Sequence, residues 1–209
     1  MQIMAESLSP EATYRLMSGV VVPRPIAWIT TVSDDGVVNL APFSCFTFVS
    51  NKPPLIGVNI GRKAGVRKDT GANIHASGEY VINIGDATQL EAIHLSSVEH
   101  PPEVSETDVL GLATAPSRII RTPRLADVPV SMECRLERII EFGDTGAEFV
   151  VGEVLVFHLR DGLYRDGKVD TRELNPVCRI GGPNYASLGD IVTLRAVGQT
   201  EKSVLNRNG

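Results

Sequence analysis

The chain has 209 residues, of which 43% are hydrophobic and 22% are charged, values that are ordinary for a globular protein with a hydrophobic core. Its net charge of −5 argues against a nucleic-acid partner, because phosphate backbones are bound by clustered Lys and Arg. The longest uncharged stretch, residues 37–51, is shorter than the ~20 apolar residues that a membrane helix needs. We therefore expect a soluble protein that crosses no membrane.

Three cysteines, Cys45, Cys134 and Cys178, lie far apart and form no CxxC pair. Their number and spacing suit neither a disulfide framework nor a zinc site. The N-terminus has no basic segment ahead of an apolar run, and it carries Glu6 and Glu11, which a signal peptide would not. These features predict a cytoplasmic protein with reduced thiols.

No repeat, charge block or linker divides the sequence, so we expect a single domain over residues 1–209. A short helix over 10–18 is expected to open the chain. The β-branched residues of 25–32 predict a strand, and the Asp-Gly step at 34–36 predicts a hairpin turn after it. Further strands are expected over residues 37–40, 46–50 and 55–60.

Residues 68–77 predict a helix, because Asp69 or Thr70 is able to cap the free backbone N–H groups at its start. It is followed by an expected strand over 79–84, a capped helix over 88–96 and a loop-rich segment over 97–117. The middle of the chain therefore places two short helices between strands.

The clearest periodicity lies over residues 130–137, where apolar and polar residues alternate. The pattern predicts a strand with one face in water. A turn at 143–146 leads to a strand over 148–159, whose apolar run predicts burial on both faces, and Asp166-Gly167 predicts another hairpin turn. Residues 195–209 form a polar tail, interpreted as either mobile or laid across a partner.

Many strands, few helices and hairpin spacing favour a mainly β protein over a doubly wound α/β sheet. The expected architecture is an antiparallel β-barrel with a few peripheral helices.

Several familiar catalytic and nucleotide-binding motifs are incomplete or absent. Residues 162–168 match most of a phosphate-binding P-loop, but Val169 replaces the Ser or Thr that would hold magnesium. No G-x-G-x-x-G follows a strand, and neither G-x-S-x-G nor H-E-x-x-H occurs. His94, Glu99 and His100 are close in sequence but lack the spacing of tetrahedral ligands, so no metal site is expected.

Two segments combine side chains that suit one composite ligand. Residues 39–48 mix aromatic, small and hydroxyl residues, which favours a flat heteroaromatic ring. Residues 62–70 gather four cations around a predicted helix start, and helix N-termini with adjacent Lys and Arg favour anions such as phosphate. Each segment alone is equally consistent with barrel core or a solvated charged face; their pairing favours a ligand site.

The same segments carry a family resemblance that runs from about residue 12 to residue 194. The motifs are Pro23-Arg-Pro-Ile-Ala-Trp28, Gly36-x-x-Asn39-Leu-Ala-Pro-Phe-Ser44-x-Phe46, Arg67-Lys68-Asp69-Thr70, Gly78-Glu-Tyr-Val-Ile-Asn83 and Pro176-Val-Cys-Arg179-Ile-Gly181-Gly182-x-x-Tyr185. In order and spacing they resemble the flavin reductase-like, FMN-binding split-barrel family, in particular its branch of flavoredoxins and related flavin reductases.

The resemblance implies a split β-barrel with Greek-key-like antiparallel strands, FMN as cofactor and a homodimer with the cofactor cleft between subunits. It implies that the flavin ring and ribityl chain are lined by Asn39, Ala41, Ser44 and Phe46, with Thr30 and Thr31 near the ring. It assigns the phosphate to Arg62, Lys68, Asp69 and Thr70. Arg179 and Tyr185 match a segment near the site, from the same or the second subunit.

By the same resemblance, NADH or NADPH gives a hydride to N5 of FMN, and the reduced flavin serves a second redox protein or a monooxygenase. The Ser44 hydroxyl is the candidate group near N5, and no catalytic acid or base is assigned. The alternative is a non-enzymatic electron carrier of the flavoredoxin kind. A structural domain that has lost its cofactor is a third interpretation, which the retained Lys68 and Thr70 disfavour.

Overall fold

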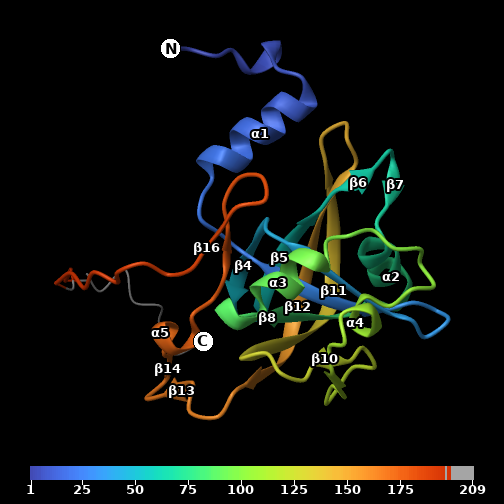
Figure 1. Cartoon of the computed structure of the whole chain (residues 1–209), viewed down its shortest axis with the longest axis vertical. Helices are drawn as coiled ribbons and strands as arrows, with labels where there is room; N and C mark the ends of the chain where they lie inside the picture. The colour runs from blue at the N-terminus through green and yellow to red at the C-terminus, as the bar shows by residue number, and fades with distance from the viewer. Residues whose placement is uncertain (196, 199–209) are drawn as a thin grey trace.

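A seven-stranded antiparallel sheet forms the body of the molecule (Figure 1), in a computed structural model that describes residues 1–195, 197 and 198. The sheet has the strand order β3-β2-β8-β11-β12-β5-β4. Its strands are β2 (Ala27–Val32), β3 (Val38–Phe43), β4 (Phe46–Asn51), β5 (Pro54–Ile60), β8 (Glu79–Ile84), β11 (Val130–Phe142) and β12 (Ala147–Leu159). The sheet curls on itself so that β3 also contacts β5, which confirms the mainly β barrel. Most of the expected tail lies outside the described residues.

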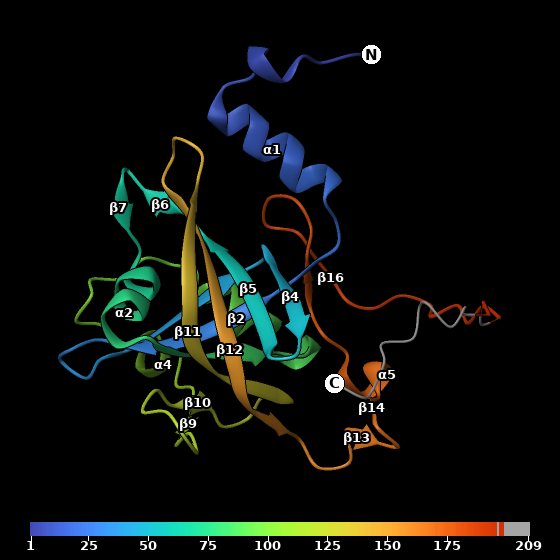
Figure 2. The same cartoon turned by 180° about the vertical axis from the view of Figure 1, so that it is seen from behind.

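Four short ribbons decorate the barrel. They comprise β1 (Arg24–Pro25) with β15 (Cys178–Arg179) and β16 (Tyr185–Ala186), β6 (Arg62–Lys63) with β7 (Val66–Arg67), β9 (Thr114–Ala115) with β10 (Arg124–Leu125), and β13 (Tyr164–Arg165) with β14 (Lys168–Val169). Asp166 and Gly167 both have positive φ between β13 and β14, which confirms the predicted turn. Seen from behind (Figure 2), the long β11–β12 hairpin reaches the β6–β7 hairpin, where Arg62 pairs with Glu141.

The helices lie at the periphery. They are α1 (Pro10–Val20), α2 (Asp69–Ser77), α3 (Leu90–Leu95), α4 (Glu106–Val109) and α5 (Thr171–Leu174), with 3-10 turns η1 (Ala5–Ser7) and η2 (Ala87–Gln89). Figure 1 shows α1 standing away from the barrel, and none of its residues is buried. In the described part of the chain, no helix has the length and apolarity that a bilayer crossing requires.

The core is divided by the wall of the barrel. Alternate residues of β2 point to opposite sides, so Ile29 joins the barrel interior while its neighbour Trp28 joins a second cluster beneath α3. That second cluster includes Leu40 and Ile93. The predicted turn between β2 and β3 is confirmed, with Gly36 at φ +85°. This turn sets the register that carries β3 past the N-terminus of α2.

The predicted cap of the helix over 68–77 is wrong, whereas the helix over 88–96 is capped as expected. The cap residue of α2 is Lys68, and its side chain makes no capping bond, while Asp69 and Thr70 already lie inside the helix. The helix expected over 88–96 is η2 followed by α3, and Asp86 caps η2 in a reciprocal capping box with Gln89. The first difference matters for function, because it leaves the start of α2 without a side-chain partner.

The prediction that one face of residues 130–137 is exposed to solvent is also wrong at its first positions. Ser131 and Glu133 are buried to 1% and 0% exposure. The segment expected as loop, 97–117, contains α4 and β9. The residues directly after it, Arg118, Ile119 and Ile120, all donate their backbone N–H groups to the Glu133 carboxylate. A local alternation pattern does not reveal a loop that returns to cover a strand.

Candidate functional site

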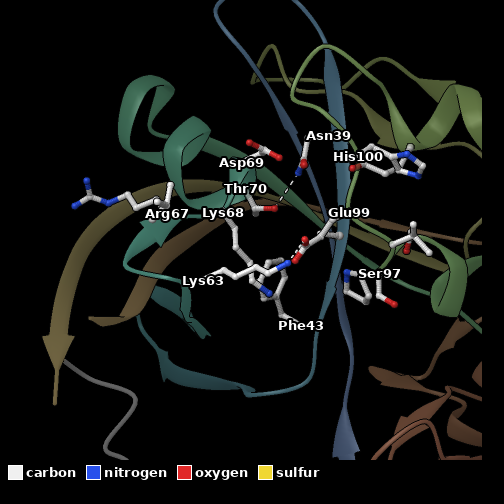
Figure 3. Close-up of a pocket in the computed structure, with 16 residues that line it drawn as sticks. Asn39, Phe43, Lys63, Arg67, Lys68, Asp69, Thr70, Ser97, Glu99 and His100 are labelled. Carbon is white, nitrogen blue, oxygen red and sulfur yellow. Dashed lines mark hydrogen bonds and ion pairs between the residues drawn. The ribbon is translucent and has the colours of Figure 1, made fainter. Parts of the chain in front are cut away.

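A cavity of about 290 Å³ lies where β3 passes the start of α2. One wall is the β3 segment Asn39, Ala41, Pro42 and Phe43, and the facing wall is Lys68, Asp69 and Thr70. The third side is the segment 96–100 that follows α3, together with Glu106 of α4. The two segments that the sequence paired as ring site and phosphate site therefore meet in a single cavity (Figure 3).

The phosphate side of this cavity is built on the N-terminus of α2. No side chain caps this helix, so its first-turn N–H groups stay available to a ligand. The helix dipole adds partial positive charge at the same end, which favours an anion. Lys68 precedes the helix and places its ammonium 5.8 Å from the centre of the Phe43 ring, within cation–π range. A cation, free N–H groups and an aromatic face thus adjoin.

Thr70 is held in place by a buried hydrogen-bond network. Its Oγ1 accepts from Asn39 Nδ2 at 2.9 Å, and the same nitrogen lies 3.2 Å from Thr31 Oγ1. Thr31 also accepts from Asn73 Nδ2 at 3.0 Å. Because the Thr70 oxygen accepts from Asn39, its own proton remains free to be donated to a ligand oxygen. The network fixes α2 against the barrel and presents one hydroxyl to the cavity.

A second network holds two arginines beside the site. The Glu148 carboxylate, with a side chain 2% exposed, lies 2.9 Å from Nη2 of both Arg62 and Arg67, and 3.1 Å from His75 Nε2. Burial by itself raises the pKa of Glu148, but hydrogen bonds from Arg67, His75 and Arg62 outweigh it and lower the pKa to about 2. Figure 3 shows Arg67 pointing away from Phe43. Arg62 does not line the cavity.

Acidic groups line the third side of the cavity. Glu99 and Lys63 form an ion pair, and both side chains are mostly exposed. Glu106 is buried to 7% exposure, and its Oε2 accepts the Leu40 N–H at 2.8 Å. Among the described residues, Lys68 has no carboxylate partner, unlike the other two cations that line the cavity, Lys63 and Arg67. Lys68 is therefore the cation with the least competition for a bound anion.

The remaining sequence-predicted residues lie around the cavity rather than in its lining. Thr30 is fully buried and donates to the Pro123 carbonyl at 2.7 Å. Ser44 accepts from Arg24 Nε at 3.3 Å, at the turn that follows β3. Phe46, at the start of β4, packs against the barrel core.

Arg179 and Tyr185 form a separate cluster on the β15–β16 ribbon. The Arg179 guanidinium lies 4.5 Å over the Tyr185 ring and donates to its hydroxyl. The hydroxyl also lies 3.0 Å from His94 Nδ1 of α3. Within one chain this cluster does not line the cavity.

Sequence reasoning missed the side of the cavity formed by residues 96–106. Ser97, Glu99, His100 and Glu106 all line it. The sequence predicts a loop here, and it offers Glu99 and His100 only as metal ligands, for which their spacing is unsuitable. The length of this loop between two helices was the one available signal, because long loops in compact domains are often functional.

A model of the flavin reductase like domain matches residues 17–173, which is most of the chain. The chain is 41% identical over 199 residues to the protein BH2278 of Halalkalibacterium halodurans, covering 93% of this chain and 95% of that one. The chain therefore belongs to the flavin reductase like family. Membership makes it an oxidoreductase of a flavin-binding class.

Two solved structures are similar along almost their whole length. Nitrilotriacetate monooxygenase component B from Bacillus cereus is 36% identical with a TM-score of 0.90, covering 93% of this chain and 98% of that chain. Pseudomonas fluorescens 2-nitrobenzoate 2-nitroreductase NbaA is 32% identical with a TM-score of 0.86, covering 94% and 96%. A split barrel domain protein from Shewanella frigidimarina, 22% identical with a TM-score of 0.82 over 94% of this chain and all of that one, shares the fold.

Proposed function

We propose that this chain binds FMN in the cavity between β3 and α2 and works as an NAD(P)H-dependent flavin reductase. The observation that carries the proposal is the meeting of Lys68, Thr70 and the uncapped start of α2 with the β3 wall in one cavity. A phosphate monoester carries close to two negative charges, and this donor set is of the kind that binds it. The family and the two similar solved structures described above support flavin chemistry.

Different residues of the cavity would contact the phosphate, the ribityl chain and the ring of FMN. Lys68, the Thr70 hydroxyl and the first N–H groups of α2 hold the phosphate. Asp69 contributes its backbone N–H, because it is the first residue of α2. Asn39 and Ala41 flank the ribityl chain and ring, supported from behind by Thr30 and Thr31. Ser44 and Phe46 close the far end of this wall. Because Ser44 accepts from Arg24, its proton is free to be donated at the ring edge.

When bound, FMN supplies the ring that accepts a hydride from NADH or NADPH. The chain's contribution is to orient that ring, exclude water from one face and stabilise the negative charge that reduction adds. Hydroxyl and backbone donors suffice for this task, so the proposal assigns no residue as general acid or base.

A homodimer is part of the proposal. Helix α1 has no buried residue and exposes Tyr14, Met17 and Val20, and the edge strand β4 exposes Phe48. Apolar surface of this kind is usually covered in the working protein. A second copy of the chain fits this role, and it would bring the Arg179–Tyr185 cluster of one subunit toward the cleft of the other. We place this dimer in the cytoplasm, in keeping with the three free cysteines.

The likeness to a monooxygenase component supports a partner monooxygenase, to which reduced flavin would be delivered. The likeness to a nitroreductase supports direct reduction of a bound acceptor as the second possible use of the same site. An assay with FMN and either NADH or NADPH, in which nicotinamide oxidation is followed by absorbance, separates a reductase from an electron carrier. Flavin that stays bound but is reduced only by another redox protein identifies the carrier.

The phosphate site is tested by replacing its two side chains. Lys68→Ala with Thr70→Ala is expected to weaken FMN binding by about 2–4 kcal/mol, because two contacts to a charged group are lost. Riboflavin, which lacks the phosphate, should bind the variant and the unaltered chain equally. Lys52→Ala, on the exposed β4–β5 turn, is the matched control. Unchanged FMN affinity in a folded double variant would refute the assignment.

A further inference from the structure

Lys63 and Glu99 meet across the cavity from two segments that are distant in sequence. Lys63 lies on β6, Glu99 lies between α3 and α4, and both line the cavity. Lys63 Nζ donates to Glu99 Oε2, and Figure 3 shows the two side chains meeting close to Phe43. The ion pair therefore joins the β6–β7 hairpin, which leads into α2, to the third side of the cavity.

The electrostatic position of Glu99 resembles that of a bound anion. The hydrogen bond from Lys63, supported by attraction to Lys63 and Lys68, lowers the pKa of Glu99. A carboxylate and a phosphate are both oxygen anions that accept from a lysine ammonium. Glu99 thus lies in the field of two lysines that line the proposed phosphate side.

The cations beside this site differ in how firmly they are held. Arg67 is fixed by Glu148, whose side chain is almost fully buried. Lys63 is held only by Glu99, and the two side chains are 67% and 63% exposed. Exposed ion pairs contribute only about 1.5- to 5-fold to an equilibrium constant. Lys63 is therefore free to change partner at little cost, whereas Arg67 is not.

We propose that Lys63 is a second cationic ligand of the flavin phosphate beside Lys68, and that Glu99 competes with this phosphate for Lys63. Lys63 exchanges the single charge of Glu99 for the nearly double charge of the phosphate monoester, which favours the exchange. The inference rests on the proposed function, since it concerns the same cavity. On this proposal Lys63 adds to the preference for phosphorylated flavin over riboflavin, and Glu99 reduces that preference.

The test measures FMN and riboflavin affinity by flavin fluorescence for the full chain and three variants. Glu99→Gln removes the competitor and should tighten FMN binding about 2- to 5-fold. Lys63→Gln removes the ligand and should weaken FMN binding about 10-fold. Riboflavin affinity should stay constant in both. Glu103→Gln, an exposed carboxylate in the same loop that does not line the cavity, is the matched control and should change neither affinity.

The outcomes separate this inference from the function on which it rests. If the unaltered chain binds FMN but Glu99→Gln weakens or does not alter that binding, the competitor role is overturned while the flavin site stands. Equal tightening of FMN and riboflavin also overturns it, because the effect would then not involve the phosphate. If the unaltered chain binds no FMN, both proposals fail together.

Discussion

The two arginines and the two lysines of the segment 62–68 differ in their carboxylate partners, although they are neighbours in sequence. Arg62 and Arg67 share the buried Glu148 carboxylate, which joins the β6–β7 hairpin to β12. Lys63 and Lys68 line the cavity, the first with an exposed partner and the second with none among the described residues. The arginines therefore stabilise the scaffold of the site, while the lysines are the cations available to a ligand.

The largest effect is expected when the carboxylate that holds the two arginines is removed. Glu148→Ala should lower the free energy of unfolding by about 2–4 kcal/mol, because two partly buried guanidinium groups lose their counter-charge. Urea or thermal unfolding measures the change. Glu141→Ala is the matched control, since Glu141 also pairs with Arg62 but is 67% exposed, and should cost less than about 0.5 kcal/mol.

Acid should remove the stability that the pairing of Glu148 with Arg62 and Arg67 contributes. The pKa of Glu148 is about 2 in the folded chain against an ordinary value of 4.5, so its contribution to stability is complete above pH 4.5 and is lost as the pH falls toward 2. The full loss amounts to about 3 kcal/mol. The unfolding free energy, measured from pH 7 to pH 3, should fall less steeply for Glu148→Gln than for the unaltered chain. Parallel curves would contradict the role of Glu148.

FMN affinity should distinguish a lysine that binds the ligand from an arginine that supports the scaffold. Lys68→Gln should weaken FMN binding about 10-fold, or ~1.4 kcal/mol, through the loss of one charge-assisted contact. Arg62→Gln should change FMN affinity less than about 2-fold, because its charge is already balanced by Glu148 and Glu141. Isothermal titration of both variants measures the difference. A larger effect at Arg62 than at Lys68 would reverse the assignment of scaffold and ligand cations.

The smallest effect is expected at the third partner of Glu148. His75→Ala removes the hydrogen bond that the imidazole makes to Glu148 Oε2 but leaves both arginines in place, and the imidazole is 35% exposed. The free energy of unfolding should fall by about 0.5–1 kcal/mol, with FMN affinity unchanged. A loss as large as that of Glu148→Ala would show that the histidine, rather than the arginines, holds the carboxylate.

Much of the fold could be predicted from local signals. The Asp-Gly steps at 34–36 and 166–167 predicted two hairpin turns because few residues tolerate positive φ, and both turns are present. The strand expected over 79–84 agrees residue for residue with β8. The strand over 130–137 was found, but the burial of Glu133 was not, because the covering N–H groups come from a loop before the strand.

For the candidate site, residue type and spacing were enough to predict which two segments combine ring-binding and phosphate-binding side chains. The different partners of the neighbouring cations could not be predicted, because Glu148 lies about eighty residues further along the chain and reaches Arg62 and Arg67 only when β12 pairs beside β5. The same holds for Glu99 and Lys63, whose meeting depends on how the loop after α3 packs across the barrel. Charge pairing between distant segments is a property of folded distance, and sequence spacing does not contain it.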